Sequence, residues 1–271
     1  MKYISVIVSI TFFCSVLWAQ EKKGEPLTFS KNSSAKSVRI DQLLGKIIVK
    51  QSNSDAFKVE VLNYEKPDKR AEGLTPIFNN NVDNTGLGLE LKEAGDKLLI
   101  YGASPQSKEA HYTIFIPNQM AISIDYSSPM AHDDVEVHGL KSAVDVKTLS
   151  ADIKFTDLSG PVMFHSISGD IEGSFSVVNQ KNPTSISAIS GDIDIALPGN
   201  TPAALSLKTI SGEIYTNFDI TFEKKKVKDE RADELAIIQS GIGGTTKGMI
   251  NSGGVKISME SISGNVYLRK K

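Results

Sequence analysis

The chain has 271 residues, of which 30 are basic and 32 are acidic, and its formal net charge at neutral pH is −2. This balance lacks the excess of Lys and Arg that non-specific binding to nucleic acid requires. Cys14 is the single cysteine, so the rest of the chain offers no disulfide, thiolate metal site or cysteine nucleophile. Stability must therefore come from buried apolar side chains and backbone hydrogen bonds.

Residues 1–20 have the pattern of a cleaved secretory signal peptide. Lys2 supplies a positive charge, residues 4–18 form an apolar run too short to span a bilayer, and Leu17-Trp18-Ala19 approximates a cleavage site. We therefore predict export to the periplasm or cell surface, with no membrane span after cleavage.

The segment that follows, residues 21–34, is polar, and we predict that it is flexible. A single domain is then expected over residues 35–271. Apolar and polar residues alternate in Val38–Ile40, Leu44–Val49 and Phe57–Val61, which is the period of a β-strand.

Residues 66–84 are the least regular part of the domain, and their prolines and asparagines predict an irregular excursion. Leu87–Leu91 and Lys97–Tyr101 flank Ala94-Gly95-Asp96, which predicts a β-hairpin. His111–Ile116 is a further expected strand. None of these stretches has a helical period.

A nine-residue repeat dominates the second half of the chain. It is carried by two sets of aliphatic residues, namely Leu140, Leu149, Leu158 and Ile167, and Val135, Val144, Ile153, Val162 and Ile171. The residue before each member of the second set alternates between an acid and Ala or Pro. One full turn is therefore predicted to contain two steps, or about eighteen residues.

Later turns are longer, with spacings of twenty-two residues from Ile171 to Ile193 and twenty-one from Ile193 to Ile214. We expect loops at 179–183 and 198–202 to absorb the difference. The pattern predicts an all-β, single-stranded β-solenoid with about 18–22 residues per turn, in which successive turns pair in parallel.

Ser-Gly pairs recur at 168–169, 190–191, 211–212 and 263–264. We interpret them as corners of the coil, where glycine permits backbone angles that other residues avoid. Residues 222–248 form a second expected excursion, with a charged loop or short helix at 222–235 and glycine bends at 237–249. The coil resumes at Val255, and Arg269-Lys270-Lys271 is expected to protect the strand edge of the last turn.

The I-S-G-D-I steps at 167–171 and 189–193 resemble those of the exported adhesin-like domains of the DUF4097 family, as do I-S-G-E-I at 210–214 and I-S-G-N-V at 262–266. That family is related to head-domain auto-transporter adhesins, and L-G-K-I-I-V at 44–49 and Y-T-I-F-I-P at 112–117 resemble its N-terminal part. The resemblance implies a right-handed β-solenoid and an exported location. It supplies no catalytic or binding residues, because its motifs are structural corners.

An outward column of acids is the first candidate for chemistry, and it comprises Asp134, Asp152, Asp170, Asp192 and Glu213. Stacked carboxylates could bind calcium, which prefers oxygen ligands. We favour the alternative, in which each acid caps its own corner by accepting hydrogen bonds from nearby backbone amides.

A second candidate is Asp134, Glu136 and His138, which share one face of a strand and could offer two oxygens and a nitrogen to an ion. The alternative is a charge ladder in which Glu136 faces Lys154 on the next turn and Glu172 on the one after.

Tyr215 and Tyr267 occupy equivalent repeat positions, and they form the outer face that we would examine first for a bound carbohydrate or protein. Stacking along the ladder is the structural alternative. No cofactor site is predicted.

No catalytic motif is present, and the Gly-rich stretch 241–247 lacks the residue order of a phosphate-binding loop. The sequence thus favours an exported, non-enzymatic interaction module with an envelope protein or glycan as its partner. A glycan-active enzyme on a β-helix scaffold and a calcium-stabilised structural solenoid are the alternatives.

Overall fold

The computed structural model describes residues 25–78, 80–222 and 244–271, and this part of the chain is built almost entirely of β-strands. The strands of the N-terminal part are β1 (Leu27–Asn32), β2 (Ser37–Asp41), β3 (Lys46–Gln51), β4 (Ala56–Leu62), β5 (Ile77–Phe78), β6 (Asn81–Val82), β7 (Leu89–Ala94), β8 (Lys97–Gly102), β9 (His111–Ile116) and β10 (Ala121–Tyr126). The repeat region contains β11 (Val135–His138), β12 (Val144–Thr148), β13 (Ile153–Leu158), β14 (Val162–Ser166), β15 (Ile171–Phe175), β16 (Thr184–Ala188) and β17 (Ile193–Leu197). The C-terminal part contains β18 (Ala203–Thr209), β19 (Ile214–Thr216), β20 (Thr221–Phe222), β21 (Thr246–Ile250), β22 (Val255–Ser261) and β23 (Val266–Lys270). Two short 3-10 turns, η1 (Lys69–Ala71) and η2 (Pro105–Glu109), are the helical elements of these ranges.

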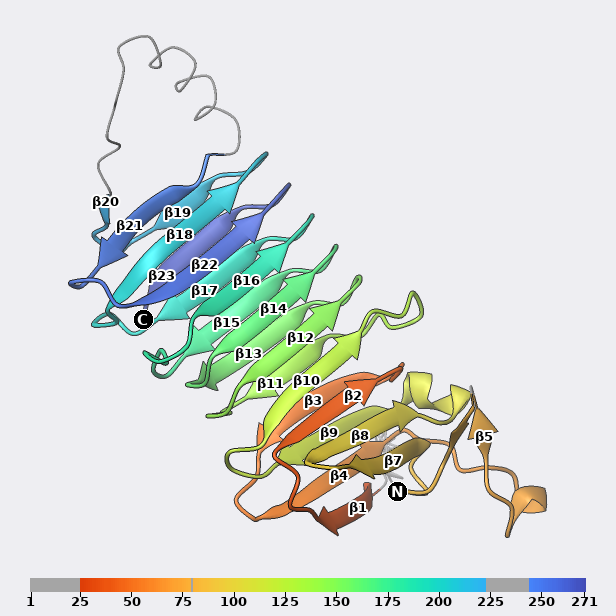
Figure 1. Ribbon diagram of the computed structural model, residues 1–271. Helices are drawn as coiled ribbons and strands as arrows, with labels where there is room; N and C mark the ends of the chain where they lie inside the picture. The colour runs from red at the N-terminus through yellow and green to blue at the C-terminus, as the bar shows by residue number, and fades with distance from the viewer. Residues whose placement is uncertain (1–24, 79, 223–243) are drawn as a thin grey trace, which may run out of the picture.

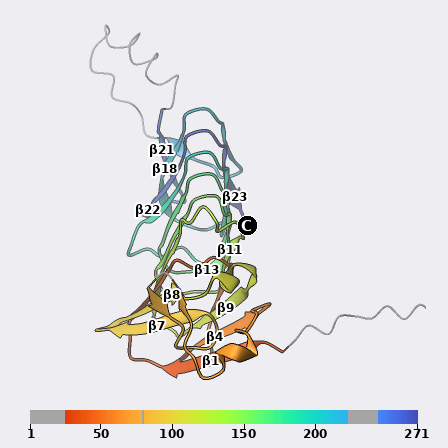
Figure 2. The same cartoon turned by 90° about the vertical axis from the view of Figure 1, so that its right-hand side faces the viewer.

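Two long sheets face each other and run the length of the molecule (Figures 1 and 2). Sheet A has the strand order β1-β4-β9-β3-β11-β13-β15-β17-β23-β19, and sheet B has the order β20-β21-β18-β22-β16-β14-β12-β10-β2-β8-β7. From β10 to β17 the chain alternates between the sheets, so that two strands and two corners make one turn. No helix of the described residues is long and apolar enough to cross a membrane.

The predicted eighteen-residue turn is confirmed. Val135 pairs with Ile153, and Ile153 with Ile171, in parallel register within sheet A. Val144 pairs with Val162 in the same way within sheet B. The two types of nine-residue step therefore belong to the two sheets, and the structure is a β-solenoid as the repeat predicts.

The order of the last two turns differs from the prediction. The sequence places Ile214 directly above Ile193, but Val266 pairs with both of them and lies between. In sheet B, β22 likewise lies between β16 and β18. The C-terminal strands are thus inserted into the stack, and Arg269–Lys271 does not guard the last strand of the solenoid.

Antiparallel strands close both ends of the solenoid, whereas the repeat predicts parallel pairing alone. At one end β4 pairs antiparallel with β9, and the predicted β7–β8 hairpin forms the end of sheet B. At the other end β21 and β20 add antiparallel to β18. The excursion at 66–84 contains η1 and the small β5–β6 hairpin.

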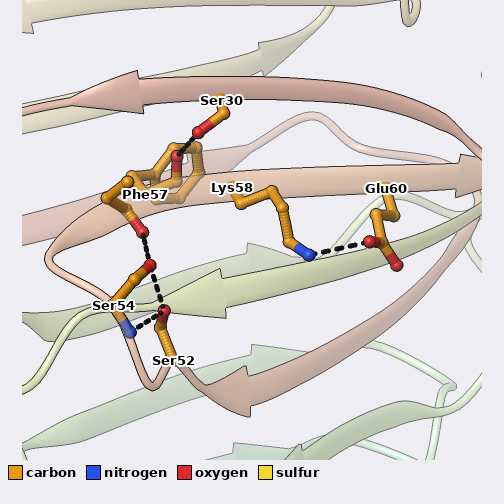
Figure 3. Close-up of polar contacts among 7 residues, drawn as sticks. Ser30, Ser52, Ser54, Phe57, Lys58 and Glu60 are labelled. Carbon is orange, nitrogen blue, oxygen red and sulfur yellow. Dashed lines mark hydrogen bonds and ion pairs between the residues drawn. The ribbon is translucent and has the colours of Figure 1, made fainter.

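The N-terminal segment is more ordered than predicted, because Leu27–Asn32 forms β1 and pairs antiparallel with β4. Ser30 Oγ donates a hydrogen bond to the carbonyl oxygen of Phe57 on β4, at 3.4 Å (Figure 3). The turn between β3 and β4 is held by Ser52, whose Oγ accepts a hydrogen bond from the backbone N–H of Ser54 at 3.0 Å. The alternation of Leu27 and Phe29 with polar residues was a strand signal that the prediction of a flexible segment overlooked.

Two predicted features fall in or near residues that the structure does not describe. The predicted signal peptide at 1–20 and the charged segment at 223–235 lie outside the described residues. Of the predicted glycine bends, Gly248 is instead part of β21, where it pairs with Leu205 of β18.

Inward-facing side chains form continuous columns between the sheets. The largest group is aromatic, since the Phe155 ring lies 5.2 Å, centroid to centroid, from both Phe164 and Phe175. All three are buried. The two kinds of corner differ, because Leu158 is fully buried whereas Ile167, its equivalent one step later, is exposed.

The Ser-Gly pairs do lie at corners, but the glycines have a different role from the one predicted. Gly169, Gly191 and Gly264 do not have positive φ angles. A Cβ atom on Gly191 would instead lie 2.1 Å from the carbonyl oxygen of Gly169, and one on Gly264 would lie 2.1 Å from that of Gly191. Glycine is therefore required because the backbones of successive corners touch.

A buried hydroxyl supports these corners from inside, and the sequence analysis missed it. Ser261 Oγ accepts a hydrogen bond from Gly264 N–H and donates one to the carbonyl oxygen of Gly191, both at 2.9 Å. Thr209 makes the equivalent bonds to Gly212 and Gly264, at 3.0 and 2.8 Å. The signal was the Ser or Thr two residues before three of the four Ser-Gly pairs, namely Ser166, Thr209 and Ser261.

Candidate functional site

The outer face of sheet A carries a row of polar and aromatic side chains from successive turns. Parallel register places the row in the order Glu136, Lys154, Glu172, Asp194, Tyr267 and Tyr215. Neighbouring members lie about 4.8 Å apart along the solenoid, because this is the spacing of paired strands. The row therefore brings together residues that are up to 131 positions apart in sequence, from Glu136 to Tyr267.

A groove of about 480 Å³ runs beside the charged part of this row, and we call it the sheet A groove. It is lined by Glu136, His138, Lys154, Thr156, Glu172 and Asp194.

Its shape follows from local sequence. Gly173 pairs with Phe155 and Ile195 on the two flanking strands but has no side chain, and a Cβ atom there would lie 2.5 Å from the Phe155 ring. The register also shifts between Phe155 and Leu158, where Asp157 has a φ of 54°. Gly173 faces inward and leaves room in the core for the buried Phe155 ring, whereas the bulge bends the sheet beside the groove.

At one end of the sheet A groove Glu136 is held by two partners. Its Oε1 lies 2.6 Å from Lys46 Nζ, and its Oε2 lies 3.2 Å from His138 Nε2. The hydrogen bond with Lys46, aided by His138, holds the pKa of Glu136 below its ordinary value. Glu136 is thus fixed as an anion at neutral pH, which suits ion pairing and not proton donation.

Lys154 pairs with a different acid from the one predicted. Its Nζ lies 2.5 Å from Asp134 Oδ2, and this hydrogen bond raises the pKa of Lys154. Glu136 and Glu172 flank Lys154 in register, as the charge ladder predicts, but neither is its hydrogen-bonded partner. Of the three residues considered for a metal ion, Glu136 and His138 are in contact while Asp134 turns to Lys154. No cluster of three potential metal ligands is found among the described residues.

The tyrosine pair lies at the other end of the row. The rings of Tyr215 and Tyr267 are stacked, with centroids 5.2 Å apart and an angle of 9° between their planes. The guanidinium of Arg269 lies 5.4 Å from the Tyr267 ring centroid. Arg269 is held there by Asp194, whose two oxygens accept hydrogen bonds at 2.6 Å.

Stacking along the ladder and surface exposure occur together at this pair. Tyr215 is 47 % exposed, and its hydroxyl donates a hydrogen bond to Glu213, which raises the tyrosine pKa. The pair therefore offers an aromatic surface with a cation, a carboxylate and a hydroxyl beside it. Aromatic and charged groups of this kind are typical of recognition surfaces.

The acid column at the corner is engaged with the backbone of the neighbouring turn. Asp152 Oδ1 accepts a hydrogen bond from the N–H of Asp170, and Asp170 Oδ1 accepts one from Asp192, both at 2.8 Å. Asp192 bonds the N–H of Asn265 at 2.7 Å, and Asn265 bonds that of Glu213 at 2.9 Å. The acids thus cap corners, as one interpretation predicts, but each caps the next turn in the stack and not its own.

Two larger hollows lie at the N-terminal end of the solenoid. One of about 780 Å³ is lined by Asn63–Glu65, η2 and His111, and one of about 730 Å³ lies between residues 66–76 and Asp83. The Asp83 carboxylate is saturated there by the backbone N–H groups of Thr85, Gly86 and Gly88. This carboxylate is therefore used to hold a loop.

The molecule is thus a β-solenoid of two-strand turns that presents a charged groove and an aromatic pair on one outer face. Its backbone is similar to the crystal structure of a proposed cell adhesion protein from Clostridium sporogenes, with a TM-score of 0.50 and 11% identity over 91% of this chain and 100% of that one. A proposed adhesin from Bacteroides fragilis matches over 91% of this chain and 97% of its own, with 13% identity and a TM-score of 0.32. At such identities the likeness concerns the fold alone.

The chain belongs to the Toastrack DUF4097 family, whose model matches residues 81–241. This assignment confirms the resemblance that the I-S-G steps suggested. No curated protein matches the chain.

Proposed function

We propose that this chain is an exported, non-enzymatic interaction module that binds a glycan of the bacterial envelope or surface through the outer face of sheet A. The observation that carries the proposal is the stacked Tyr215–Tyr267 pair. Tyr215 is exposed and Tyr267 is half-buried, and the pair adjoins Asp194 of the sheet A groove. Sugars combine apolar ring faces with many hydroxyls, so a protein surface that recognises them needs aromatic and hydrogen-bonding groups side by side.

The groups beside the pair match this need. Arg269 and Asp194 hold each other in position, so little side-chain freedom is lost when a ligand binds. Glu172 lines the sheet A groove and forms no ion pair among the described residues. It is therefore available to accept hydrogen bonds from ligand hydroxyls.

The exported location and the role as an interaction module are supported by separate observations. The leader-like residues 1–20 support export. The Clostridium and Bacteroides structures carry proposed adhesion roles, which agrees with an interaction module. The fixed negative charge of Glu136 supports a binding role for the groove, since a general acid needs a proton at neutral pH.

Binding is tested by screening the chain from residue 25 onward against an array of bacterial glycans and envelope proteins, followed by titration of each hit. Tyr215→Ala is expected to weaken binding at least about tenfold, the typical loss for an aromatic anchor. Met163→Ala, an exposed substitution on sheet B, serves as the matched control and should leave affinity unchanged. A glycan hit that is insensitive to Tyr215→Ala would contradict the proposed site, and hits confined to proteins would contradict the ligand class.

A glycan-active enzyme is the second candidate, because Glu172 and Asp194 are neighbours in register beside the tyrosine pair. Paired carboxylates in a groove can hydrolyse glycosidic bonds. Release of new reducing ends from a bound glycan, abolished by Glu172→Gln, would establish this activity. Binding without release would support the interaction module.

A further inference from the structure

The last two strands form a coil that is inserted between two others, and we call Val255–Lys271 the C-terminal coil. On one side, Ser263 N–H donates a hydrogen bond to the carbonyl oxygen of Ile189, at 2.9 Å. On the other side, Ser211 N–H donates one to the carbonyl oxygen of Ile262, also at 2.9 Å. The C-terminal coil therefore fills a slot whose two walls are β16–β17 and β18–β19 (Figure 1).

The slot is closed only when the C-terminal coil docks, because β22 and β23 are the strands that lie between its two walls. Until the coil arrives, each wall exposes unpaired strand edges and the ends of the apolar columns. Open edges of this kind pair readily with any matching strand. A coil of identical sequence from a second copy would make the same contacts as the chain's own coil.

The connection that leads into the C-terminal coil is strained. Residues 251–254 join β21 to β22, and three successive residues are in the left-handed region, with φ angles of 46° at Asn251, 71° at Ser252 and 75° at Gly253. Asn tolerates this region, but Ser252 has no such tolerance, so the strain of the connection lies mainly at Ser252. Short hinge loops under strain favour domain swapping, because the extended, exchanged form of the hinge relieves the strain.

We propose that the C-terminal coil exchanges between two copies of this chain, giving a two-fold symmetric dimer in which each coil fills the other copy's slot. The hinge is Asn251–Gly253. The exchange is independent of the ligand proposed above, but it has a consequence for that site. Tyr267 lies on the exchanged coil and Tyr215 does not, so each tyrosine pair of the dimer would contain rings from both copies.

Cysteine cross-linking distinguishes the exchanged dimer from any other association. Ser185 on β16 and Ser258 on β22 are register partners, so their Cα atoms lie about 5 Å apart, within reach of a disulfide. One chain carries Cys14→Ser with Ser185→Cys, and the other carries Cys14→Ser with Ser258→Cys. The two are unfolded together, refolded at high concentration and oxidised.

The proposal predicts a covalent dimer in which mass spectrometry finds a 185–258 disulfide between the two chains. A chain with both cysteines provides the positive control, since it closes the same disulfide internally when it is a monomer. A protein that is monomeric by light scattering at every concentration, with no interchain 185–258 disulfide after co-refolding, would overturn the proposal. A dimer cross-linked only between like positions would overturn it as well.

Substitutions in the hinge test whether backbone strain at residues 251–253 favours the exchange. Ser252→Gly relieves strain in the closed hinge and should lower the ratio of dimer to monomer by about fivefold, the effect expected when one strained residue is relaxed. Asn182→Gly, in an exposed loop with no positive φ, is the matched control and should leave the ratio unchanged. An equal effect of both variants would show that hinge strain does not drive the exchange.

Discussion

Substitution of Gly191 by Ala tests why glycine recurs at the corners of the solenoid. An added Cβ atom would lie 2.1 Å from the Gly169 carbonyl oxygen and 2.7 Å from its carbonyl carbon. Both obstacles are backbone atoms of the turn below, which cannot rotate away as a flexible side chain would. The two turns must separate by about 1 Å, and this disturbs the hydrogen bonds that join them.

We expect Gly191→Ala to lower the free energy of unfolding by about 3 kcal/mol, the upper end of the cost of overpacking. For a protein of this size the loss corresponds to a fall in melting temperature of roughly 6–12 °C. Circular dichroism during thermal and denaturant unfolding measures both quantities.

Gly95→Ala is the control, because Gly95 has a φ of 63° and no atom within 4 Å of an added Cβ. This substitution should lower the free energy of unfolding by about 1–2 kcal/mol, because alanine disfavours the left-handed backbone conformation. Asn tolerates the left-handed region, so Gly95→Asn should be mild whereas Gly191→Asn should be as damaging as Gly191→Ala. If Gly191→Ala costs no more than Gly95→Ala, backbone stacking is not the reason for glycine at the corner.

Two further predictions concern polar groups. Ser261→Ala should lower the free energy of unfolding by about 1–3 kcal/mol, because it leaves the buried N–H of Gly264 without its hydrogen-bond partner. Ser190→Ala, at an exposed position, is the control. Equal denaturation midpoints for the two variants would contradict the role of Ser261. Glu136 has a lowered pKa in the folded state, so its contribution to stability is present above its unfolded pKa, near 4.3, and is lost as pH falls through the folded value. Because the side chain is still 24 % exposed and its ion pair lies at the surface, the contribution should be below about 1 kcal/mol. Glu136→Gln should therefore make the free energy of unfolding slightly less dependent on pH between about pH 5 and 3. If the pH dependence is the same as in the unmodified protein, the ion pairs of Glu136 do not contribute to stability.

The nine-residue repeat predicts some contacts of the candidate site and not others. Because parallel turns stack in register, the position of Tyr215 beside Tyr267 follows from their equivalent places in the repeat, and the structure places the two rings in contact. The pairing of Lys154 with Asp134 instead of Glu136 could not be predicted, since two acids lie within reach of one long side chain and local geometry selects between them. The bulge after Phe155, beside the sheet A groove, also interrupts the repeat and was not predicted.

The sequence by itself determined the period of the coil, the two kinds of strand in each turn and the identity of the inward-facing residues. Each of these follows from the alternation of apolar side chains within a strand and their recurrence between turns. Only the tertiary structure decided the order of the last turns. The coils at 203–216 and 255–268 have nearly equivalent patterns, so either one can pair with β16 and β17 by the same rules. The structure selects the C-terminal coil for that position, and the antiparallel attachment of β21 to β18 holds the earlier coil one layer further out.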